Sequence, residues 1–107
     1  MSLANEIIGN PIKLENLEVA QNDLPEAMVW QEANDFLNQI EGNWRIPTKE
    51  ELNTLFINKD KINGFADEFY WSSIEGNYGC WRQHFKDGRQ FDTSKKVKCL
   101  IRAVRSI

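Results

Sequence analysis

The sequence predicts an α+β fold in which two helices pack on a small antiparallel sheet. Apolar residues recur at helical spacing between positions 28 and 40, and a capping box opens a second helix at Lys49. After residue 68 the chain divides into short aromatic and apolar runs separated by glycine turns. Helices that precede an antiparallel meander are typical of the α+β class. With 107 residues, 41% of them hydrophobic, we expect a single domain over residues 1–107.

The first part of the chain is expected to form one or two short strands and then a helix. Apolar residues nearly alternate from Ile12 to Val19, and the break at Glu15-Asn16 predicts a turn. After Pro25 a helical stripe follows, and Gly42 is its expected C-cap. The residues of this stripe are Met28, Trp30, Ala33, Phe36, Leu37 and Ile40.

A second helix is expected to begin at Lys49. Pro47 holds the preceding Ile46 extended, and Thr48 with Glu51 forms a capping box that satisfies free donors at the helix start. The apolar stripe of this helix is Leu52, Leu55 and Phe56, and we expect the helix to end near residues 58–60.

The remainder is expected to be a loop followed by a meander. Residues 58–68 are mostly polar and predict a surface loop anchored by Ile62 and Phe65. The expected strands begin at Phe69 and then cover Gly79–Phe85, Gln90–Asp92 and Val97–Arg105, with turns at Glu75–Asn77 and Lys86–Arg89.

Three segments stand in a fixed order with compatible spacing. They are Trp-Arg-Ile-Pro-Thr-Lys-Glu-Glu-Leu at Trp44–Leu52, Tyr-Trp-Ser-Ser at Tyr70–Ser73, and Ile-Arg-Ala-Val-Arg at Ile101–Arg105. This order resembles a bacterial and phage family of unknown function, typified by the C-terminal domain of collagen-like adhesins (Lcl C-terminal-like). The resemblance covers roughly residues 12–105. It implies a C-type lectin-like fold, near the formylglycine-generating-enzyme type.

The aromatic residues and Arg45 of these segments have a structural interpretation. Trp30 and Trp71 are expected in the core, and Trp44 is expected to pack where the chain enters the second helix. Arg45, held between Trp44 and the Ile46-Pro47 turn, is expected to be partly buried and paired with a carboxylate or with carbonyls. We interpret it as a structural clamp rather than a ligand contact.

The two cysteines, Cys80 and Cys99, have neither metal-ligand nor redox-pair spacing. Buried free thiols are the favoured interpretation, and a disulfide between them is the alternative. Members of the resembled family often carry a cysteine pair at positions that align with Leu37 and Ala103. The resemblance therefore implies apolar packing at both positions, which suits a reducing compartment.

Charge is unevenly distributed along the chain, whose net charge is −3. Residues 1–80 hold 5 basic and 14 acidic side chains, whereas residues 81–107 hold 8 and 2. Acidic and basic parts that neutralise each other are one explanation, and a face that binds polyanions is the other. Strand alternation predicts which side chains share a face. In the strand at residues 79–85, Trp81, Gln83 and Phe85 lie on one face. In the last strand, the residues expected to point inward are Val97, Cys99, Ile101 and Ala103. The opposite faces would form a basic patch of Arg82, His84, Lys86, Lys98 and Arg102, near Tyr78.

No catalytic or metal-binding set is expected. The enzymes of the resembled fold use paired cysteines that this chain does not reproduce. Ser72 and Ser73 would need a base, and the lone His84 is interpreted as structural; the serines are expected to bond backbone groups. No zinc ligand set or lectin-type calcium motif occurs, so we expect no cofactor. The acidic residues of the long loop, expected to be solvated, are Asp60, Asp67 and Glu68.

The expected function is therefore a non-catalytic binding module of C-type lectin-like type. It would use the loop at residues 58–68, the turn at 75–79 and the basic patch. The ligand stays open at this point: the options are an anionic glycan or another polyanion, or another protein, and neither nucleic acid nor a membrane is expected. The collagen-like adhesins of the resembled family bind sulfated glycans, but a shared fold does not fix the ligand. The alternative is a structural or assembly subunit of a bacterial or phage particle. The sequence has no membrane span and no signal-peptide pattern, which predicts a cytoplasmic or virion-associated protein; secretion stays open if a leader precedes the sequence.

Overall fold

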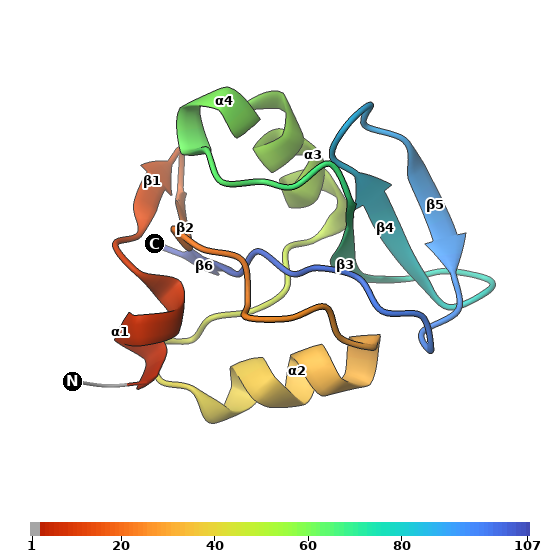
Figure 1. The fold of residues 1–107 in the computed structure, drawn as a ribbon, viewed down its shortest axis with the longest axis horizontal. Helices are drawn as coiled ribbons and strands as arrows, with labels where there is room; N and C mark the ends of the chain where they lie inside the picture. Colours follow the sequence, from red (N-terminus) through yellow and green to blue (C-terminus); the bar gives the residue numbers. More distant parts are fainter. Residues whose placement is uncertain (1–2) are drawn as a thin grey trace.

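The described part of the chain, residues 3–107 of a computed structural model, contains four helices and two three-stranded antiparallel sheets (Figure 1). The helices are α1 (Leu3–Ile8), α2 (Trp30–Gln39), α3 (Lys49–Ile57) and α4 (Lys59–Ile62). The strands are β1 (Ile12–Leu14), β2 (Leu17–Val19), β3 (Phe69–Glu75), β4 (Cys80–His84), β5 (Gln90–Thr93) and β6 (Val104–Ser106). The fold is of the α+β class, as predicted from the sequence.

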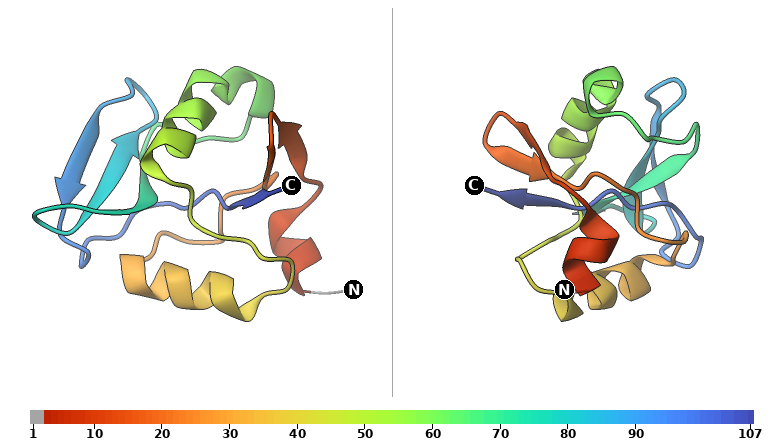
Figure 2. Two further views of the ribbon diagram at one scale, coloured as in Figure 1. Left: turned by 180° about the vertical axis from the view of Figure 1, so that it is seen from behind. Right: turned by 60° about the vertical axis from the view of Figure 1, so that its left-hand side comes forward.

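The two sheets lie at opposite ends of the molecule, and the last segment of the chain connects them (Figures 1 and 2). One sheet has the order β1-β2-β6, and the turn between β1 and β2 falls at Glu15-Asn16 as predicted. The other has the order β3-β4-β5, with a register shift in β3 between Trp71 and Glu75. Helices α2 and α3 lie on opposite sides of the connecting segment, so each covers its own part of the core.

The last segment is not the continuous strand predicted for Val97–Arg105. Only its end forms β6, because its backbone groups bond first to β3 and then to the loop that follows β2. Both sides of the segment are therefore covered, and residues 101–104 are all buried. The predicted alternation of inward and outward residues is wrong here, since Val97 is 37% exposed and Val104 is buried.

Arg102, predicted on the outward basic patch, is also fully buried. Its Nε donates to Asp23 Oδ1 at 2.8 Å, and its Nη1 donates to the carbonyls of Ala20 and Asn63 at 3.3 and 3.2 Å. The Tyr70 hydroxyl donates to the second Asp23 oxygen at 2.6 Å. Burial, helped by this bond to Asp23, raises the pKa of Tyr70. Arg102 is therefore a structural residue and not part of a ligand-binding face.

Helix α2 is shorter than predicted at both ends. Met28, assigned to the helix by its spacing, exchanges two backbone hydrogen bonds of 3.0 and 3.1 Å with Cys99, which hold it extended. Ile40 is extended too, with ψ of 154°, so the helix ends before the C-cap predicted at Gly42. Helical spacing identified residues that are buried or partly buried here, but the backbone at the start of the helix follows long-range bonds that the pattern does not contain.

The sequence analysis predicts neither α1 nor α4. Both are short, and α4 lies inside the stretch predicted as a loop over residues 58–68. Residues 63–68 do form the expected irregular segment, in which Asn63 and Gly64 have φ of 68° and 83°. The predicted anchors Ile62 and Phe65 both pack in a hydrophobic cluster with α3 and β3, which holds the segment down.

The entry into α3 has the predicted geometry. Thr48 Oγ1 accepts a hydrogen bond from the Glu51 amide at 3.1 Å, and Glu51 Oε1 accepts one from the Thr48 amide at 2.8 Å. Arg45 contacts both oxygens of Glu51, at 2.6 and 2.8 Å, as a bidentate clamp. Mainly through this hydrogen bonding to Arg45, the pKa of Glu51 lies below its ordinary value.

Two hydrophobic clusters make up the core. The first lies around α2 and contains Trp44, Trp71, Leu37 and Ala103, with Trp30 partly buried against it. The second lies around α3 and β3 and contains Tyr70 among others. The positions aligned with the family's cysteine pair are therefore apolar packing positions, as the resemblance implies.

We expect Glu51→Gln to destabilise the protein by roughly 0.5–1 kcal/mol at pH 7. Glutamine can keep the hydrogen bond to the Thr48 amide, so the decrease in the free energy of unfolding reports only the charge that pairs with Arg45. Since the folded-state pKa of Glu51 is lowered, its charge stabilises the fold above its unfolded pKa of about 4.3, and this stability is lost as pH falls through the lowered value. Urea unfolding of both proteins from neutral to acid pH should show the difference shrinking. Glu50→Gln, an exposed neighbour in the same turn, should change little at any pH.

We expect Arg102→Met to destabilise the fold by about 3 kcal/mol or more, because it leaves the Asp23 carboxylate without its buried cation. The double variant Asp23→Asn with Arg102→Met should recover part of the loss, since it removes the orphaned charge and keeps an oxygen for the Tyr70 hydroxyl. Urea unfolding measures both. A double variant no more stable than the single one would show that the charge pair is not the cause.

Candidate functional site

The outer face of the β3-β4-β5 sheet carries the part of the predicted basic patch that the structure brings together. The alternation predicted for β4 is correct: Gln83 bonds Asn53 of α3 at 2.9 Å, whereas Arg82 and His84 both contact the Phe69 ring on the other face. The Cζ of the Arg82 guanidinium lies 3.7 Å from the centroid of that ring, and the rings of His84 and Phe69 are nearly perpendicular with their centroids 4.6 Å apart. Phe69 therefore organises both basic residues.

A pocket of about 420 Å³ opens beside this stack and is called the Arg82 pocket below. Its principal lining residues are Arg82, Lys98, Glu68, Phe69 and Leu100. The Arg82 Nε is buried and has no hydrogen-bond partner among the described residues, and its Nη1 reaches only the Cys99 sulfur at 3.9 Å. A buried N–H donor without an acceptor is costly, so a group that accepts from this guanidinium would be favoured here.

The other residues predicted for the patch lie elsewhere. Tyr78 is 82% exposed on the turn between β3 and β4 and does not line the Arg82 pocket. Lys86 is exposed on the β4–β5 turn. The buried Arg102 is separated from the patch altogether. The pocket thus retains Arg82 and Lys98 of the predicted set, with His84 next to it on the same ring.

The contribution of Phe69 was missed by the sequence analysis, which interpreted it only as the start of a strand. Its role depends on the pairing of β3 with β4, which places Phe69 opposite His84 and next to Arg82. Glu68 was expected only as a solvated acidic residue of the long loop. The role of Phe69 could have been predicted from its position next to Tyr70. Because neighbouring residues of a strand point to opposite faces and Tyr70 is buried, the Phe69 ring lies on the outer face.

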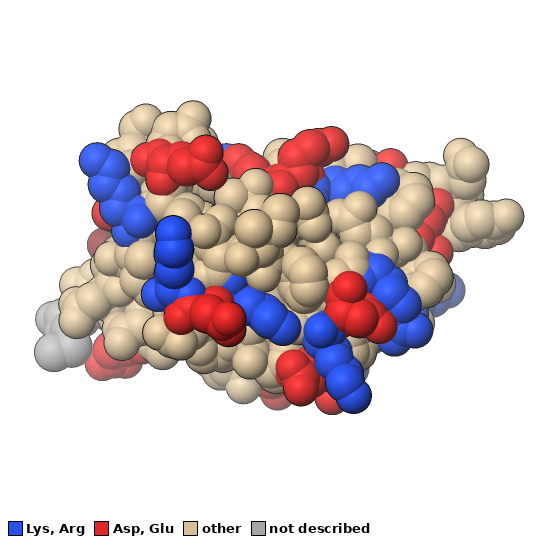
Figure 3. Space-filling model, turned by 90° about the horizontal axis from the view of Figure 1, so that it is seen from above, with Lys and Arg blue, Asp and Glu red and all other residues tan. Residues whose placement is uncertain are grey.

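Ion pairs account for much of the uneven charge along the chain. Within residues 3–107, three basic residues of the C-terminal part pair with acidic residues from the front part. These pairs are Lys95 with Glu75 at 2.7 Å, and Arg102 with Asp23 and Arg105 with Glu18 at 2.8 Å each. On the face drawn in Figure 3, acidic and basic side chains are interspersed. Mutual neutralisation is therefore a substantial part of the explanation.

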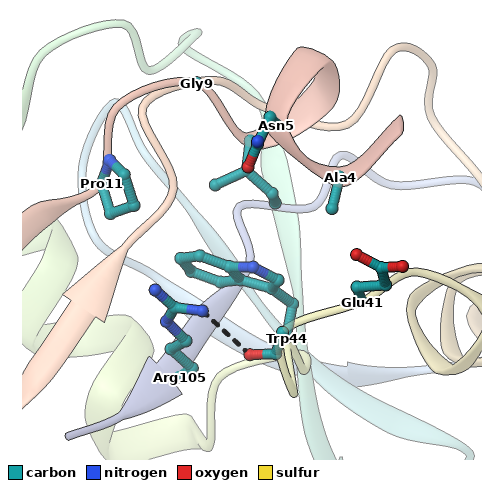
Figure 4. A pocket seen from close by; sticks show the side chains of 9 residues that line it. Ala4, Asn5, Gly9, Pro11, Glu41, Trp44 and Arg105 are labelled. Carbon is teal, nitrogen blue, oxygen red and sulfur yellow. Dashed lines mark hydrogen bonds between the residues drawn. The ribbon is translucent and has the colours of Figure 1, made fainter. Parts of the chain in front are cut away.

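A second pocket, of about 390 Å³, lies between α1 and the segment that joins α2 to α3 and is called the Trp44 pocket (Figure 4). The Arg105 guanidinium lies 4.4 Å from the Trp44 ring centroid, and its Nη1 donates to the Gly42 carbonyl at 3.1 Å. Glu41 lines the other side. No residue of this pocket belongs to the predicted patch.

The residues considered for catalysis are not assembled into a reactive set. Ser72 is buried, and its hydroxyl donates to the Trp81 carbonyl at 2.7 Å and accepts from the Ile74 amide, as expected of a structural serine. His84 Nδ1 accepts from the Lys86 amide at 3.2 Å. Within residues 3–107 no group of three or more His, Cys, Asp or Glu side chains is arranged to hold a metal ion. None of the helices described there is long and apolar enough to cross a membrane.

These features define an α+β domain whose helix entry is clamped by Arg45 and Glu51 and whose last segment is locked by a buried arginine. Residues 13–105 match the family model of the Lcl C-terminal domain, and the chain belongs to this family. The match agrees with the extent predicted from the sequence motifs and leaves α1 outside it. A search of curated proteins finds no match to the chain.

Both cysteines are free and buried, as predicted. Burial raises the pKa of Cys80 to about 11 and raises the pKa of Cys99 as well. At pH 8 only about one Cys80 in a thousand would be a thiolate, the reactive form. We therefore expect almost no reaction of the native protein with Ellman's reagent, and rapid reaction of both thiols in urea. A fast native reaction would mean that one thiol is accessible, and fewer than two thiols in urea would mean a disulfide.

Proposed function

We propose that this chain is a non-catalytic binding module of C-type lectin-like type and that it holds an anionic group of its ligand in the Arg82 pocket. The family match and the unpaired Nε of Arg82 support this proposal. The candidate ligands are sulfated or carboxylated glycans and acidic segments of proteins.

The stack on Phe69 gives Arg82 the properties of a preorganised anion receptor. The ring fixes the plane of the guanidinium at 3.7 Å, so little side-chain freedom is lost when a ligand binds. An oxyanion can accept two parallel hydrogen bonds from one edge of a guanidinium. The Nε of Arg82 has no hydrogen-bond partner among the described residues, so an oxyanion would supply the acceptor that this edge of the guanidinium lacks.

Lys98 and Glu68 tune the charge of the pocket. Lys98 is exposed and adds a second positive charge next to Arg82. Glu68 lines the same pocket and opposes a high density of negative charge. The pocket therefore suits one sulfate or carboxylate at a time, rather than a continuous polyanion.

The test compares two double variants that each remove two positive charges. Arg82→Gln with Lys98→Gln should weaken binding of a short heparin-derived oligosaccharide by at least about tenfold in calorimetry. Lys61→Gln with Lys96→Gln, two exposed lysines outside the pocket, should leave the affinity nearly unchanged. Arg82→Lys, which keeps the charge and loses the planar fork, should be intermediate.

An equal loss of affinity in both double variants would contradict binding at the Arg82 pocket and indicate a general effect of net charge. The proposal would be overturned if the wild-type protein bound neither sulfated glycans, nor carboxylated glycans, nor acidic peptides. The assembly role would then be favoured, because Tyr78 and Ile57 are 82% and 71% exposed and could contact another subunit. Self-association in sedimentation, lost in Tyr78→Ser, would support that alternative.

A further inference from the structure

We propose that the Trp44 pocket binds a small zwitterion, a molecule with one carboxylate and one ammonium group such as a free α-amino acid. The proposal is independent of the Arg82 pocket, which shares no lining residue with it. Residues 4–11, which form one wall, precede the part of the chain that matches the family. The site therefore depends on a segment outside the matched region.

The positive side of the pocket is Arg105. Its Nε is bonded to Glu18 at 2.8 Å and its Nη1 to the Gly42 carbonyl at 3.1 Å, so the guanidinium is held rigidly against the Trp44 ring. No described residue accepts a hydrogen bond from its Nη2, and this atom is not among the buried unpaired ones. Nη2 is therefore a fixed, accessible donor for a carboxylate.

The negative side is Glu41, which follows the end of α2. It is exposed and has no ion pair or hydrogen bond to any residue in the range 3–107. In Figure 4 Glu41 and Arg105 lie on opposite sides of the Trp44 indole. Opposite charges on two sides of one pocket match the dipole of a zwitterion.

Gly42 allows Trp44 and Arg105 to lie close to its backbone. A Cβ at this position would lie 2.8 Å from Trp44 Nε1 and 3.0 Å from Arg105 Nη1, and the backbone φ of 105° is one that other residues rarely adopt. The indole N–H has no acceptor among the described residues, so it provides a further donor next to Arg105. The pocket thus combines two donors with one carboxylate.

Other small ligands fit these groups less well. A sugar usually stacks on an open aromatic face, but Trp44 is only 5% exposed and Arg105 lies over its ring. A sulfate or phosphate has no cationic group to pair with Glu41, so the Glu41 carboxylate would repel it. A divalent cation would find one carboxylate where several oxygen ligands are needed. The apolar side chains of Ala4, Ile8 and Pro11 on the α1 wall favour a zwitterion with an apolar side chain.

The experiment uses the full chain and three probes that share one side chain, of which two each lack one of the charged groups: L-leucine, N-acetyl-L-leucine and L-leucinamide. The indole N–H signal of Trp44, assigned by its absence in Trp44→Phe, is followed by nitrogen-15 NMR during each titration. L-leucine should shift this signal saturably, with a Kd of about 1 mM or below, as expected for a small rigid site. The acetylated probe lacks the ammonium and the amide lacks the carboxylate, so each should bind at least about tenfold more weakly.

Glu41→Gln should weaken binding of L-leucine by roughly tenfold or more without affecting the fold, because Glu41 is exposed. The matched control is Glu32→Gln, an exposed acidic residue of α2 that does not line the pocket. The proposal would be overturned if L-leucine gave no saturable shift up to about 10 mM. It would also be overturned if N-acetyl-L-leucine bound as well as L-leucine, or if Glu41→Gln bound L-leucine like the control.

Discussion

The buried guanidinium of Arg102 is the interaction on which the arrangement of the fold depends. It bonds Asp23 and Ala20 after β2 and Asn63 after α4, and it lies 4.1 Å from the Phe65 ring. A buried cation must keep its partners, because an unpaired charge in the core costs several kcal/mol. The loop after β2, the end of α4 and the last segment of the chain are therefore fixed relative to one another. Since that last segment also bridges to β3 and ends in β6, the same constraint connects the two sheets.

Ion pairs of arginines near the surface also hold elements of the fold together, with smaller contributions to its stability. Arg45 fixes the start of α3 through Glu51, and Arg105 fixes β6 against β2 through Glu18. Both are partly exposed, so removing one partner of either pair costs less than removing one partner of the buried pair. Because Lys95, Arg102 and Arg105 of the C-terminal part of the chain are each paired with a carboxylate, the positive charge that remains for a ligand is local. It is a positive excess at Arg82 and Lys98, and a balanced pair of charges in the Trp44 pocket.

The sequence predicts those features whose cause is local. The capping box, the β1–β2 turn and the alternation of Arg82 with Gln83 each depend on residues only a few positions apart. The position of Arg102 depends on Asp23, 79 residues away, and the start of α2 depends on the bond between Met28 and Cys99. Patterns of period 2 or 3.6 carry no information on such partners. For the same reason Arg82 and Lys98 could be chosen from the sequence, but the Trp44 pocket, with walls from three separate segments, could not.

The two pockets contact the same final segment of the chain, one at residues 98–100 and the other at residue 105. A ligand in either pocket would therefore contact the same segment of the chain that lines the other pocket. Coupling between sites requires an element with two arrangements that both ligands bias. Arg102 lies between these two parts of the segment. Its hydrogen bonds to Asp23 and to two carbonyls hold the segment in a single conformation. The geometry thus favours two independent sites, whose ligands would add their effects on stability without changing each other's affinity.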